Sequence, residues 1–315
     1  MYKKLILFFC CFVPTVSCGD DLIDQAQQVF DATQIVCSGI SDEISKVSNV
    51  SKINTAVTGV GTVAAGGALV AGVKKSQEEE EIDKLVAEIC ANGGCTAAGV
   101  QEMTDEEFFN NVIGPMAEVE ELRKKLKRSK KLGNWRTGLM AGTVGANIAS
   151  AIVSGVNRDQ SELVQHIQAC NQAIVSAGEM SERLKKAGVS PVYVPVADAL
   201  GDVGALCGNI NTADIEKIEK RMTGVMGTSI AGAVIGVAGT ATSAAANSDK
   251  YMDDKNRLLL NEQDRKKKDN LNATANVLAG ANVATGLVGT GLNVSLVTLA
   301  QKLIKQAERC ESVFK

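Results

Sequence analysis

The sequence predicts an all-α protein made of long helical hairpins, a coiled-coil-like bundle with four Gly/Ala-rich apolar segments. Three observations predict this fold. Apolar residues recur at alternating steps of three and four, which is the spacing of helices that pack along one seam. Aromatic residues make up only 3% of the chain while Gly and Ala are abundant, so helices can approach one another closely. Each apolar segment is also flanked by strongly charged stretches.

The first element is an export signal over residues 1–17. Lys3 and Lys4 precede a short apolar run, and small residues follow before Cys18. This order is typical of a signal peptide, and the run is too short to span a membrane. Residues 15–18 also resemble a bacterial lipobox, which makes Cys18 a candidate for lipidation, with simple cleavage near Ser17 as the alternative. We expect a periplasmic, cell-envelope or secreted protein, anchored by lipid if Cys18 is modified.

The charge balance argues against nucleic acid as a partner. The chain has 33 basic and 36 acidic residues, a net charge of −3, and loss of Lys3 and Lys4 makes the mature chain more acidic. Such a protein has no overall electrostatic reason to hold nucleic acid. The basic run at 123–131 could bind phospholipid headgroups or nucleic acid, but a solvated or paired helix face is the preferred interpretation.

Disulfides are expected because an exported chain with an even number of cysteines typically pairs them. Setting aside Cys10, Cys11 and Cys18 leaves six candidates: Cys37, Cys90, Cys95, Cys170, Cys207 and Cys310. The pairing is left open, although the Gly93-Gly94 turn favours a local Cys90–Cys95 bridge. The alternative is that all six are small buried residues.

The first helical half is predicted over 18–187. Heptad spacing runs from Ile23 to Val47 and slips at Ser48-Asn49, where the helix either breaks or continues. The first apolar segment, 53–73, follows, and then an acidic stretch at 78–81. Thr104 and Glu107 form a capping box for the next helix, which leads into the second apolar segment, 138–156.

A connector at 188–210 separates this half from the second, 211–315. Pro191 and Pro195 around a Val-Tyr-Val run predict an extended conformation. Asn211 or Thr212 caps the next helix, which contains the third apolar segment, 222–246. The fourth segment is 271–299.

Charges and repeats indicate how the segments pair. In an antiparallel hairpin of the first two segments, Glu78–Glu81 lie near Lys127–Lys131, and in a second hairpin Asp253 and Asp254 face Arg265–Lys268. Exposed pairs of this kind select a register more than they stabilise the fold. Thr-Gly pairs at 58–59, 137–138 and 223–224 also align as a divergent internal repeat, with chance similarity among Gly-rich helices as the alternative.

Small residues at every fourth position form two rows that resemble glycine zippers. One row is Gly138, Gly142, Ala146, Ser150 and Ser154, and the other is Gly224, Thr228, Gly232, Gly236 and Thr240. Because Gly costs roughly 1 kcal/mol per helix position relative to Ala, so many glycines require close packing in compensation. We therefore predict that these ten positions are helix-packing sites.

The apolar segments suit either a water-soluble bundle or a membrane. Each lacks Asp, Glu, Lys and Arg, and each is almost long enough to cross a bilayer core. Trp135 and Tyr251 sit beside segment ends, where interfacial anchors belong. Against insertion stand the weak hydrophobicity and the Asn residues within the segments. A soluble bundle is the first expectation.

No catalytic, metal or cofactor site is predicted. Residues 59–64 match the pattern G-x-G-x-x-A, but no strand-helix-strand unit surrounds them. His166 is the only histidine, and it has no nucleophile at a recognisable spacing. Cys90 and Cys95 lack the two-residue gap of typical zinc pairs. We expect a non-enzymatic protein with no cofactor and no small-molecule substrate.

The predicted function is therefore structural or interactive, meaning self-association or binding of a protein partner through the glycine-zipper-like faces. The alternative is a membrane-active protein, pore-forming or translocator-like, that inserts its Gly/Ala-rich hairpins into a bilayer.

Overall fold

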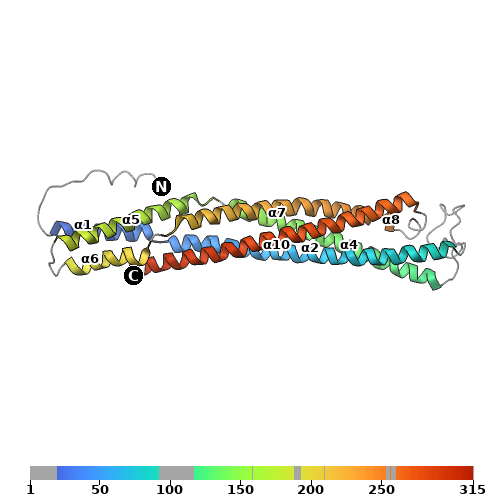
Figure 1. The fold of residues 1–315 in the computed structure, drawn as a ribbon, viewed down its shortest axis with the longest axis horizontal. Helices are drawn as coiled ribbons and strands as arrows, with labels where there is room; N and C mark the ends of the chain where they lie inside the picture. The colour runs from blue at the N-terminus through green and yellow to red at the C-terminus, as the bar shows by residue number, and fades with distance from the viewer. Residues whose placement is uncertain are drawn as a thin grey trace. The chain divides into compact units, whose positions relative to one another are not determined.

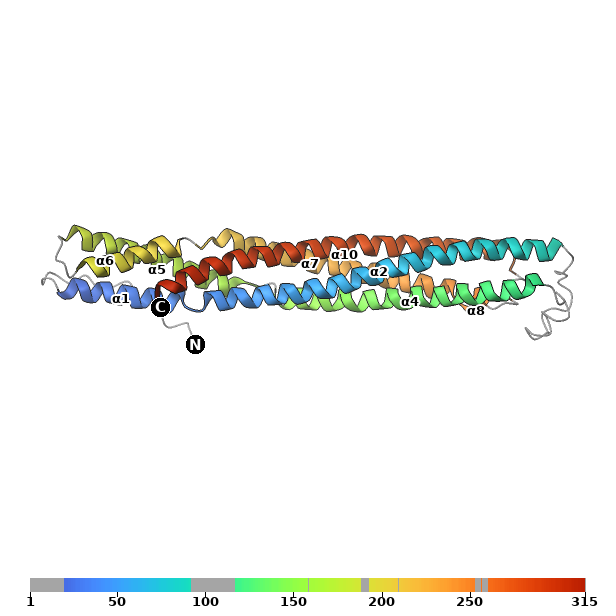
Figure 2. The same cartoon turned by 90° about the horizontal axis from the view of Figure 1, so that it is seen from below.

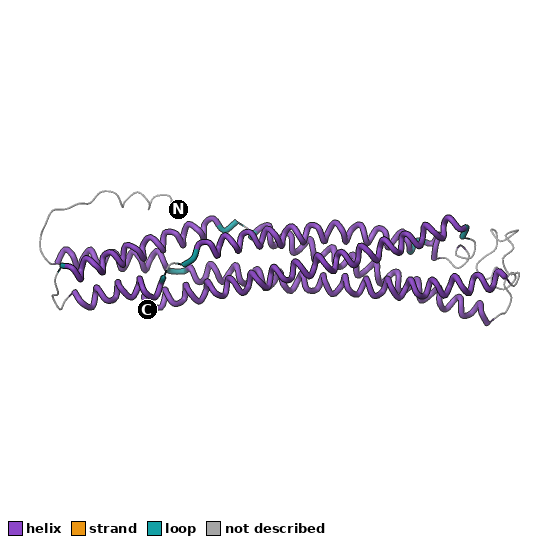
Figure 3. The backbone as a smooth tube through the Cα atoms, in the orientation of Figure 1, coloured by secondary structure: helices purple, strands orange, loops and turns teal. Residues whose placement is uncertain are grey.

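The computed structural model describes residues 20–91, 117–157, 159–187, 193–208, 210–252, 256 and 260–314. Within these residues the chain is helical almost throughout and contains no strand (Figure 3). The predicted all-α fold of long packed helices is confirmed. The main helices are α1 (Asp20–Cys37), α2 (Ile40–Ala91), α4 (Ala117–Val156), α5 (Ser161–Lys186), α6 (Tyr193–Asp202), α7 (Thr212–Ala246) and α10 (Glu262–Glu311).

The chain forms two compact units. Unit 1 consists of the described residues within Met1–Lys46, Gln160–Glu216 and Ala300–Lys315, and unit 2 of those within Val47–Asp159 and Lys217–Leu299. Each unit thus draws on both of the sequential halves expected from the sequence. Three of the long helices, α2, α7 and α10, each contribute one end to unit 1 and the rest to unit 2.

Unit 1 packs α1, α5 and α6 around an ordinary apolar core (Figure 1). The buried side chains include Ile44, Leu163, Ile167 and Leu200. They follow the three-and-four spacing of their helices, so one stripe of each helix faces the others. In this unit, then, the sequence pattern places large aliphatic side chains inside.

The break between α1 and α2 lies at Gly39, where the backbone adopts a φ of +80°. Gly tolerates this left-handed conformation, which most other residues avoid. By contrast, α2 is continuous through Ser48-Asn49. The slip in the heptad pattern at that point therefore does not interrupt the helix.

The connector expected to be extended is mostly helical where the structure describes it. Residues 193–202 form α6, and Val203–Cys207 add one turn of π-helix, η4. Pro195 falls in the first turn of α6, where a missing backbone N–H costs nothing. Ala197, Leu200 and Val203 are buried, because their helical spacing gives this segment an apolar face that packs on α5. Pro191 lies outside the described residues.

Unit 2 is a four-helix arrangement of α2, α4, α7 and α10, which run side by side (Figures 1 and 2). Hydrogen bonds fix their directions: Asn54 on α2 bonds Ser154 on α4, and Ser129 on α4 bonds Glu79 on α2, so these two helices are antiparallel. The contacts of Ser150 with Ser229 and of Arg136 with Ser243 make α4 and α7 antiparallel as well.

The charge pairing expected for the first hairpin is present. Arg128 pairs with Glu78 at 3.0 Å, and Lys125 pairs with Glu81. The second hairpin differs from the expectation. Lys268 pairs with Glu79 on α2 in the interior, while the exposed pair joins Lys250 to Asp264 at 2.7 Å. Asp253 and Asp254 lie outside the described residues.

Candidate functional site: the polar interior of unit 2

The interior of unit 2 is lined by small and polar side chains along its apolar segments. The buried positions of α4 advance by steps of four and three from Leu122 to Ser154, and the other three helices do the same. This is heptad spacing, which keeps one row on the contact seam. Within the apolar segments the small and polar seam residues are Asn54, Thr58, Gly61, Thr143, Asn147, Ser150, Ser154, Ser229, Gly232, Gly236, Asn282, Gly289 and Asn293. The same seams also bury Ala65, Ala68, Met140, Val225, Ala279 and Leu296.

Large aliphatic side chains instead cover the outside of unit 2. Val63 is 77% exposed, Val234 is 65% exposed and Val277 is 72% exposed. The other exposed aliphatic residues of these segments are Ile53, Val60, Val70, Val73, Ile148, Ile152, Val156, Ile230, Val237, Leu287, Val288 and Val294. In these segments unit 2 therefore exposes many of its large aliphatic side chains and buries small and polar ones beside a few apolar residues such as Met140.

An amide layer joins α4 and α10 in the middle of their apolar segments. The side-chain amide of Asn147 donates to Oδ1 of Asn282 at 3.2 Å, and both residues are buried. Gly232 and Gly236 on α7 face this pair, so that a Cβ added at Gly232 would lie 2.5 Å from Nδ2 of Asn147. Only the missing side chains of these glycines make room for the amides.

A second layer, just beyond the apolar segments, contains buried charges from three helices. Lys75, Glu79, Arg136 and Lys268 are all at most 4% exposed. Nζ of Lys75 lies 3.4 Å from Oε1 of Glu79, and Lys268 also bonds this carboxylate. Because the charges are paired and hydrogen-bonded, their burial is tolerable, although each loses its hydration.

Asn272 on α10 is the centre of this charged layer. Its Oδ1 accepts hydrogen bonds from Lys75 at 3.1 Å and from Arg136 at 3.0 Å, and its Nδ2 donates to Glu79 at 3.2 Å. Arg136 also donates to Ser243 on α7 at 2.8 Å. One connected network thus links all four helices of unit 2.

Burial shifts the acid–base behaviour of this layer. Loss of hydration lowers the pKa of Lys75 to about 7, and the neighbouring cations Arg136 and Lys268 add to the shift while Glu79 opposes it. Lys75 lies just beyond the first apolar segment. Its charge therefore depends on pH near neutrality, which is unusual for a lysine.

The predicted zipper rows are only partly packing sites within this chain. Ala146 is half-buried and Ser150 and Ser154 are buried, but Gly138 and Gly142 are exposed, with nothing within 4 Å of an added Cβ. A row at every fourth residue drifts around a helix that has 3.6 residues per turn, whereas a heptad row does not. This drift carries the N-terminal end of the α4 row away from the seam.

The α7 row stays closer to its neighbours. Gly224 approaches Leu292, Gly232 and Gly236 contact the amide layer, and Thr228 and Thr240 are half-buried. Gly239, which the row omits, makes the tightest approach on α7, to the methyl group of Met140. Among the repeat positions, Thr58 is buried while Thr223 is exposed, so the aligned Thr-Gly pairs do not occupy the same face.

The two aromatic residues expected at segment ends differ in environment. Trp135 is 65% exposed next to the start of the second apolar segment. Tyr251 is buried and packs with Met252 and Leu260 in a small cluster. Only Trp135 is available as an interfacial anchor.

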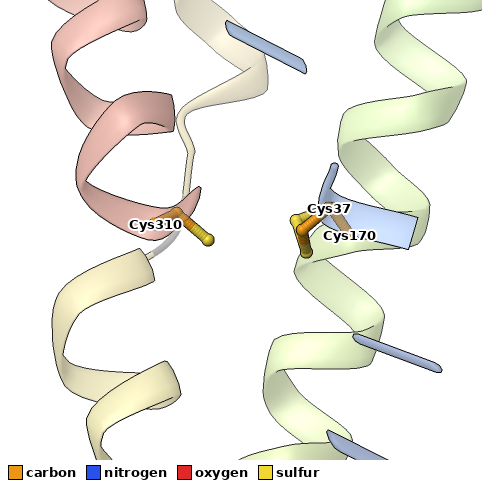
Figure 4. A group of neighbouring side chains, drawn as sticks. All are labelled: Cys37, Cys170 and Cys310. Atoms are coloured by element: carbon orange, nitrogen blue, oxygen red, sulfur yellow. A yellow bond between two sulfur atoms is a disulfide. The ribbon is translucent and has the colours of Figure 1, made fainter. Parts of the chain in front are cut away.

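Four of the six candidate cysteines are joined in unit 1. Cys37 is bonded to Cys170 and Cys207 to Cys310, and all four are buried. The sulfur of Cys310 points toward the Cys37–Cys170 pair (Figure 4), and these three sulfurs lie within 4.8 Å of one another. The side chain of Cys90, like Cys95, Cys18 and the whole predicted signal, lies outside the described residues.

His166 has a structural environment in unit 1. Its Nε2 lies 2.8 Å from the carbonyl oxygen of Val36, and its Nδ1 lies 3.2 Å from Glu43. Both ring nitrogens are thus engaged with α1 and α2. In the described part of the chain, the disulfide cysteines are the only residues of metal-ligand type that cluster.

Sequence reasoning did not find the charged layer. Lys75 and Glu79 continue the row of buried α2 residues through Ala68 and Gly72, and this continuity could have predicted that both are buried.

Four helices of the described chain are also long and apolar enough to cross a membrane, judged by length and composition. The chain matches no family model, no curated protein and no solved structure.

Proposed function

We propose that the chain is an exported, membrane-active protein whose unit 2 inserts into a bilayer as a helical bundle. The observation that supports this most is the arrangement of side chains in unit 2: Val63, Val234 and Val277 point outward while Asn147 and Asn282 are buried. Membrane-inserted helices direct polar side chains toward the bundle interior and apolar side chains toward lipid.

The alternative of a soluble unit 2 leaves its outer surface in water. Burial of apolar surface is worth about 25 cal/mol per Å², so each partly exposed Val or Ile forgoes a fraction of the roughly 1.5–3 kcal/mol that full burial contributes. Monomeric soluble proteins rarely expose large contiguous apolar patches. Lipid would cover the exposed Val, Ile and Leu side chains of unit 2, which we call its outer belt, without requiring any rearrangement of its interior.

The dimensions of the segments fit a bilayer. Residues 138–156 of α4 span about 28 Å at a rise of 1.5 Å per residue, close to a hydrocarbon core of about 30 Å. Trp135 lies one helical turn before this segment and is exposed, at the depth where indole rings sit. The charged layer of Lys75, Arg136 and Lys268 lies beyond the segments, where water and headgroups begin.

Vesicle flotation and dye release test this function directly. The full chain is mixed with vesicles of neutral phospholipid that contain a self-quenching dye, and the mixture is floated through a density gradient. We expect the protein to float with the vesicles and to release dye. A protein that stays at the bottom of the gradient without detergent and releases nothing would contradict the proposal.

Matched variants test whether flotation depends on the outer belt of unit 2 or on exposed apolar side chains anywhere in the protein. Val63→Lys with Val234→Lys places two charges on the outer belt and should abolish flotation. Ile35→Lys with Val175→Lys alters two unit 1 side chains of similar exposure, 69% and 54%, and should leave flotation unchanged. Equal effects in both pairs would mean that unit 2 has no special role.

Self-association is the second candidate, supported by the open glycine face of α4. Gly138, Gly142 and Gly145 are exposed and have no neighbour within 4 Å of an added Cβ. Gly138 and Gly142 also have the G-x-x-x-G spacing of helices that dimerise in membranes. Gly142→Leu should reduce chemical crosslinking in vesicles, while Gly227→Leu on α7, also an open position, should not. Unchanged crosslinking of Gly142→Leu would rule out this face.

A further inference from the structure

The outward face of α4 changes in character where the second apolar segment begins. Lys127, Lys131 and Trp135 are exposed and lie four residues apart, so one side of the helix carries all three. The same side continues through Gly142 to Ile152, which is also exposed. Two lysines, an indole and an apolar stretch thus follow one another along a single helix face.

The structure divides the basic run of α4 into two parts. Arg128 and Lys125 form ion pairs with two glutamates of α2. In the described chain, by contrast, Lys127 and Lys131 have no carboxylate at ion-pair distance. These two cations therefore face outward beside Trp135 rather than holding α2 and α4 together.

Two other helices carry exposed lysines at the same end of unit 2. The interior hydrogen bonds between α4 and α10 join residues 135 and 136 positions apart, so these helices are parallel with a constant offset. By that offset, Lys131 is level with Lys266 and Lys267, and both are exposed. Lys74 is exposed on α2, directly after the first apolar segment. We call these side chains the basic rim: Lys74, Lys127, Lys131, Lys266 and Lys267.

The basic rim includes an open hollow of about 470 Å³ between α7 and α10. Lys266, Lys267 and Asn270 offer hydrogen-bond donors there, and Leu271, the first residue of the fourth apolar segment, also lines it. Lys266 pairs with Glu262 at 2.8 Å, but an exposed pair of this kind is weak and does not prevent binding of another anion. The hollow thus combines donors for a phosphate with the start of an apolar surface.

We infer that the basic rim binds the headgroups of anionic phospholipids, with Trp135 at the boundary between headgroups and acyl chains. Lysines beside a membrane-inserted segment are attracted by anionic lipids, and tryptophan is enriched at that depth. The rim draws on three helices of the bundle, so it faces more than one side, as lipids around an inserted bundle do. This inference rests on the proposed insertion of unit 2.

Binding to vesicles that differ only in headgroup charge tests the rim. The full chain is titrated with vesicles of phosphatidylcholine, and with vesicles that also contain phosphatidylglycerol of the same acyl chains. We expect phosphatidylglycerol to raise the partition coefficient about ten-fold or more, since one lysine near an anionic surface strengthens binding by roughly five-fold. Concentrated salt should reduce this gain, because it screens the charges.

Neutral side chains in the rim should remove most of the gain. Lys127→Gln with Lys131→Gln and Lys267→Gln is expected to bind both kinds of vesicle about equally, with unchanged binding to phosphatidylcholine. Arginine keeps the charge, so Lys127→Arg with Lys131→Arg and Lys267→Arg should preserve the gain. The arginine variant shows whether a loss comes from charge or from altered packing.

A matched control removes the same net charge from unit 1. Lys46, Lys185 and Lys305 are exposed there, and Lys46→Gln with Lys185→Gln and Lys305→Gln should leave the gain intact. An equal loss in this control and in the rim variant would overturn the rim as the binding surface.

The fluorescence of Trp135, the only tryptophan, reports the depth of the rim. In vesicles with phosphatidylglycerol we expect stronger quenching by lipids labelled at the headgroup than by lipids brominated midway along the acyl chain. The reverse order would contradict contact of the rim with headgroups.

The outcomes distinguish this inference from the proposed function. Flotation with phosphatidylcholine vesicles but no gain from phosphatidylglycerol would overturn headgroup binding and leave insertion standing. Absence of the gain together with binding of a double-stranded oligonucleotide through the same lysines would assign the rim to nucleic acid instead. Failure to float with either kind of vesicle would overturn both proposals.

Discussion

Asn147 on α4 donates a hydrogen bond of 3.2 Å to Asn282 on α10, at the centre of two segments that contain no charged residue. In a soluble bundle these seam positions would carry Leu or Ile, as the corresponding positions of unit 1 do. The pair therefore marks the point at which the interior of these segments is most clearly polar. It also gives the first prediction a defined target.

The Asn147–Asn282 contact should contribute measurable coupling energy. In a double-mutant cycle with Asn147→Ala and Asn282→Ala, we expect a coupling of about 0.5–2 kcal/mol, the range of hydrogen bonds between membrane helices. The free energy of unfolding in mild detergent measures it. Additive effects of the two substitutions would show that the amides do not interact.

Gly232 and Gly142 should respond differently to a large side chain. Gly232→Leu forces the new side chain against Asn147 and Asn282, and overpacking of this kind costs about 1–3 kcal/mol. Gly142→Leu meets open space within the chain and should leave its stability unchanged or slightly higher, since Leu is the better helix former. Thermal unfolding followed by circular dichroism compares them, and a similar loss in both would contradict this assignment of faces.

The two disulfides of unit 1 should be found in the natural protein. Mass spectrometry of a non-reduced digest is expected to detect peptides joined through Cys37–Cys170 and through Cys207–Cys310. Cys37→Ala with Cys170→Ala should lower the free energy of unfolding by about 2–5 kcal/mol, because the bond closes a long loop. Recovery of all four cysteines as free thiols would argue against this pairing.

Lys75 should make stability depend on pH. Burial lowers its pKa from 10.5 to about 7 in the folded state, so between these two values the unfolded chain holds a proton that the folded chain has released. The free energy of unfolding should therefore rise with pH across this window, by at most about 1.4 kcal/mol per pH unit. Lys75→Met should remove the rise, and Lys74→Met should not; a slope that persists in Lys75→Met would have another source.

The sequence predicted the helices better than it predicted the faces they bury. Heptad spacing from Ile23 to Val47 and from Leu163 to Leu184 correctly identified packed helices, because large apolar side chains mark the seam directly. In unit 2 the seam carries Gly, Ser and Asn, which hydropathy alone assigns to no face. The row predicted at every fourth residue from Gly138 therefore turns away from the surface on which α4 contacts its neighbours.

Tertiary context determined the remaining features. Lys75 and Glu79 lie on a seam row, but a charged residue is normally solvated, and only the partners Asn272 and Lys268 make their burial tolerable. Pro195 indicated an extended connector, but its position in the first turn of α6 is compatible with a helix. The pairing of Cys37 with Cys170 depends on how α1 meets α5, which cysteine spacing does not encode.

Tryptophan quenching at defined bilayer depth tests most directly whether the outer face of unit 2 meets lipid. The chain has a single tryptophan, so a Trp135→Phe background accepts one new reporter: Val234→Trp at the centre of the third apolar segment, or Ile35→Trp in unit 1. In vesicles of lipids brominated midway along the acyl chain, we predict strong quenching of the Val234→Trp protein and none of the Ile35→Trp protein. Equal quenching of both, or none at Val234→Trp, would contradict insertion of unit 2.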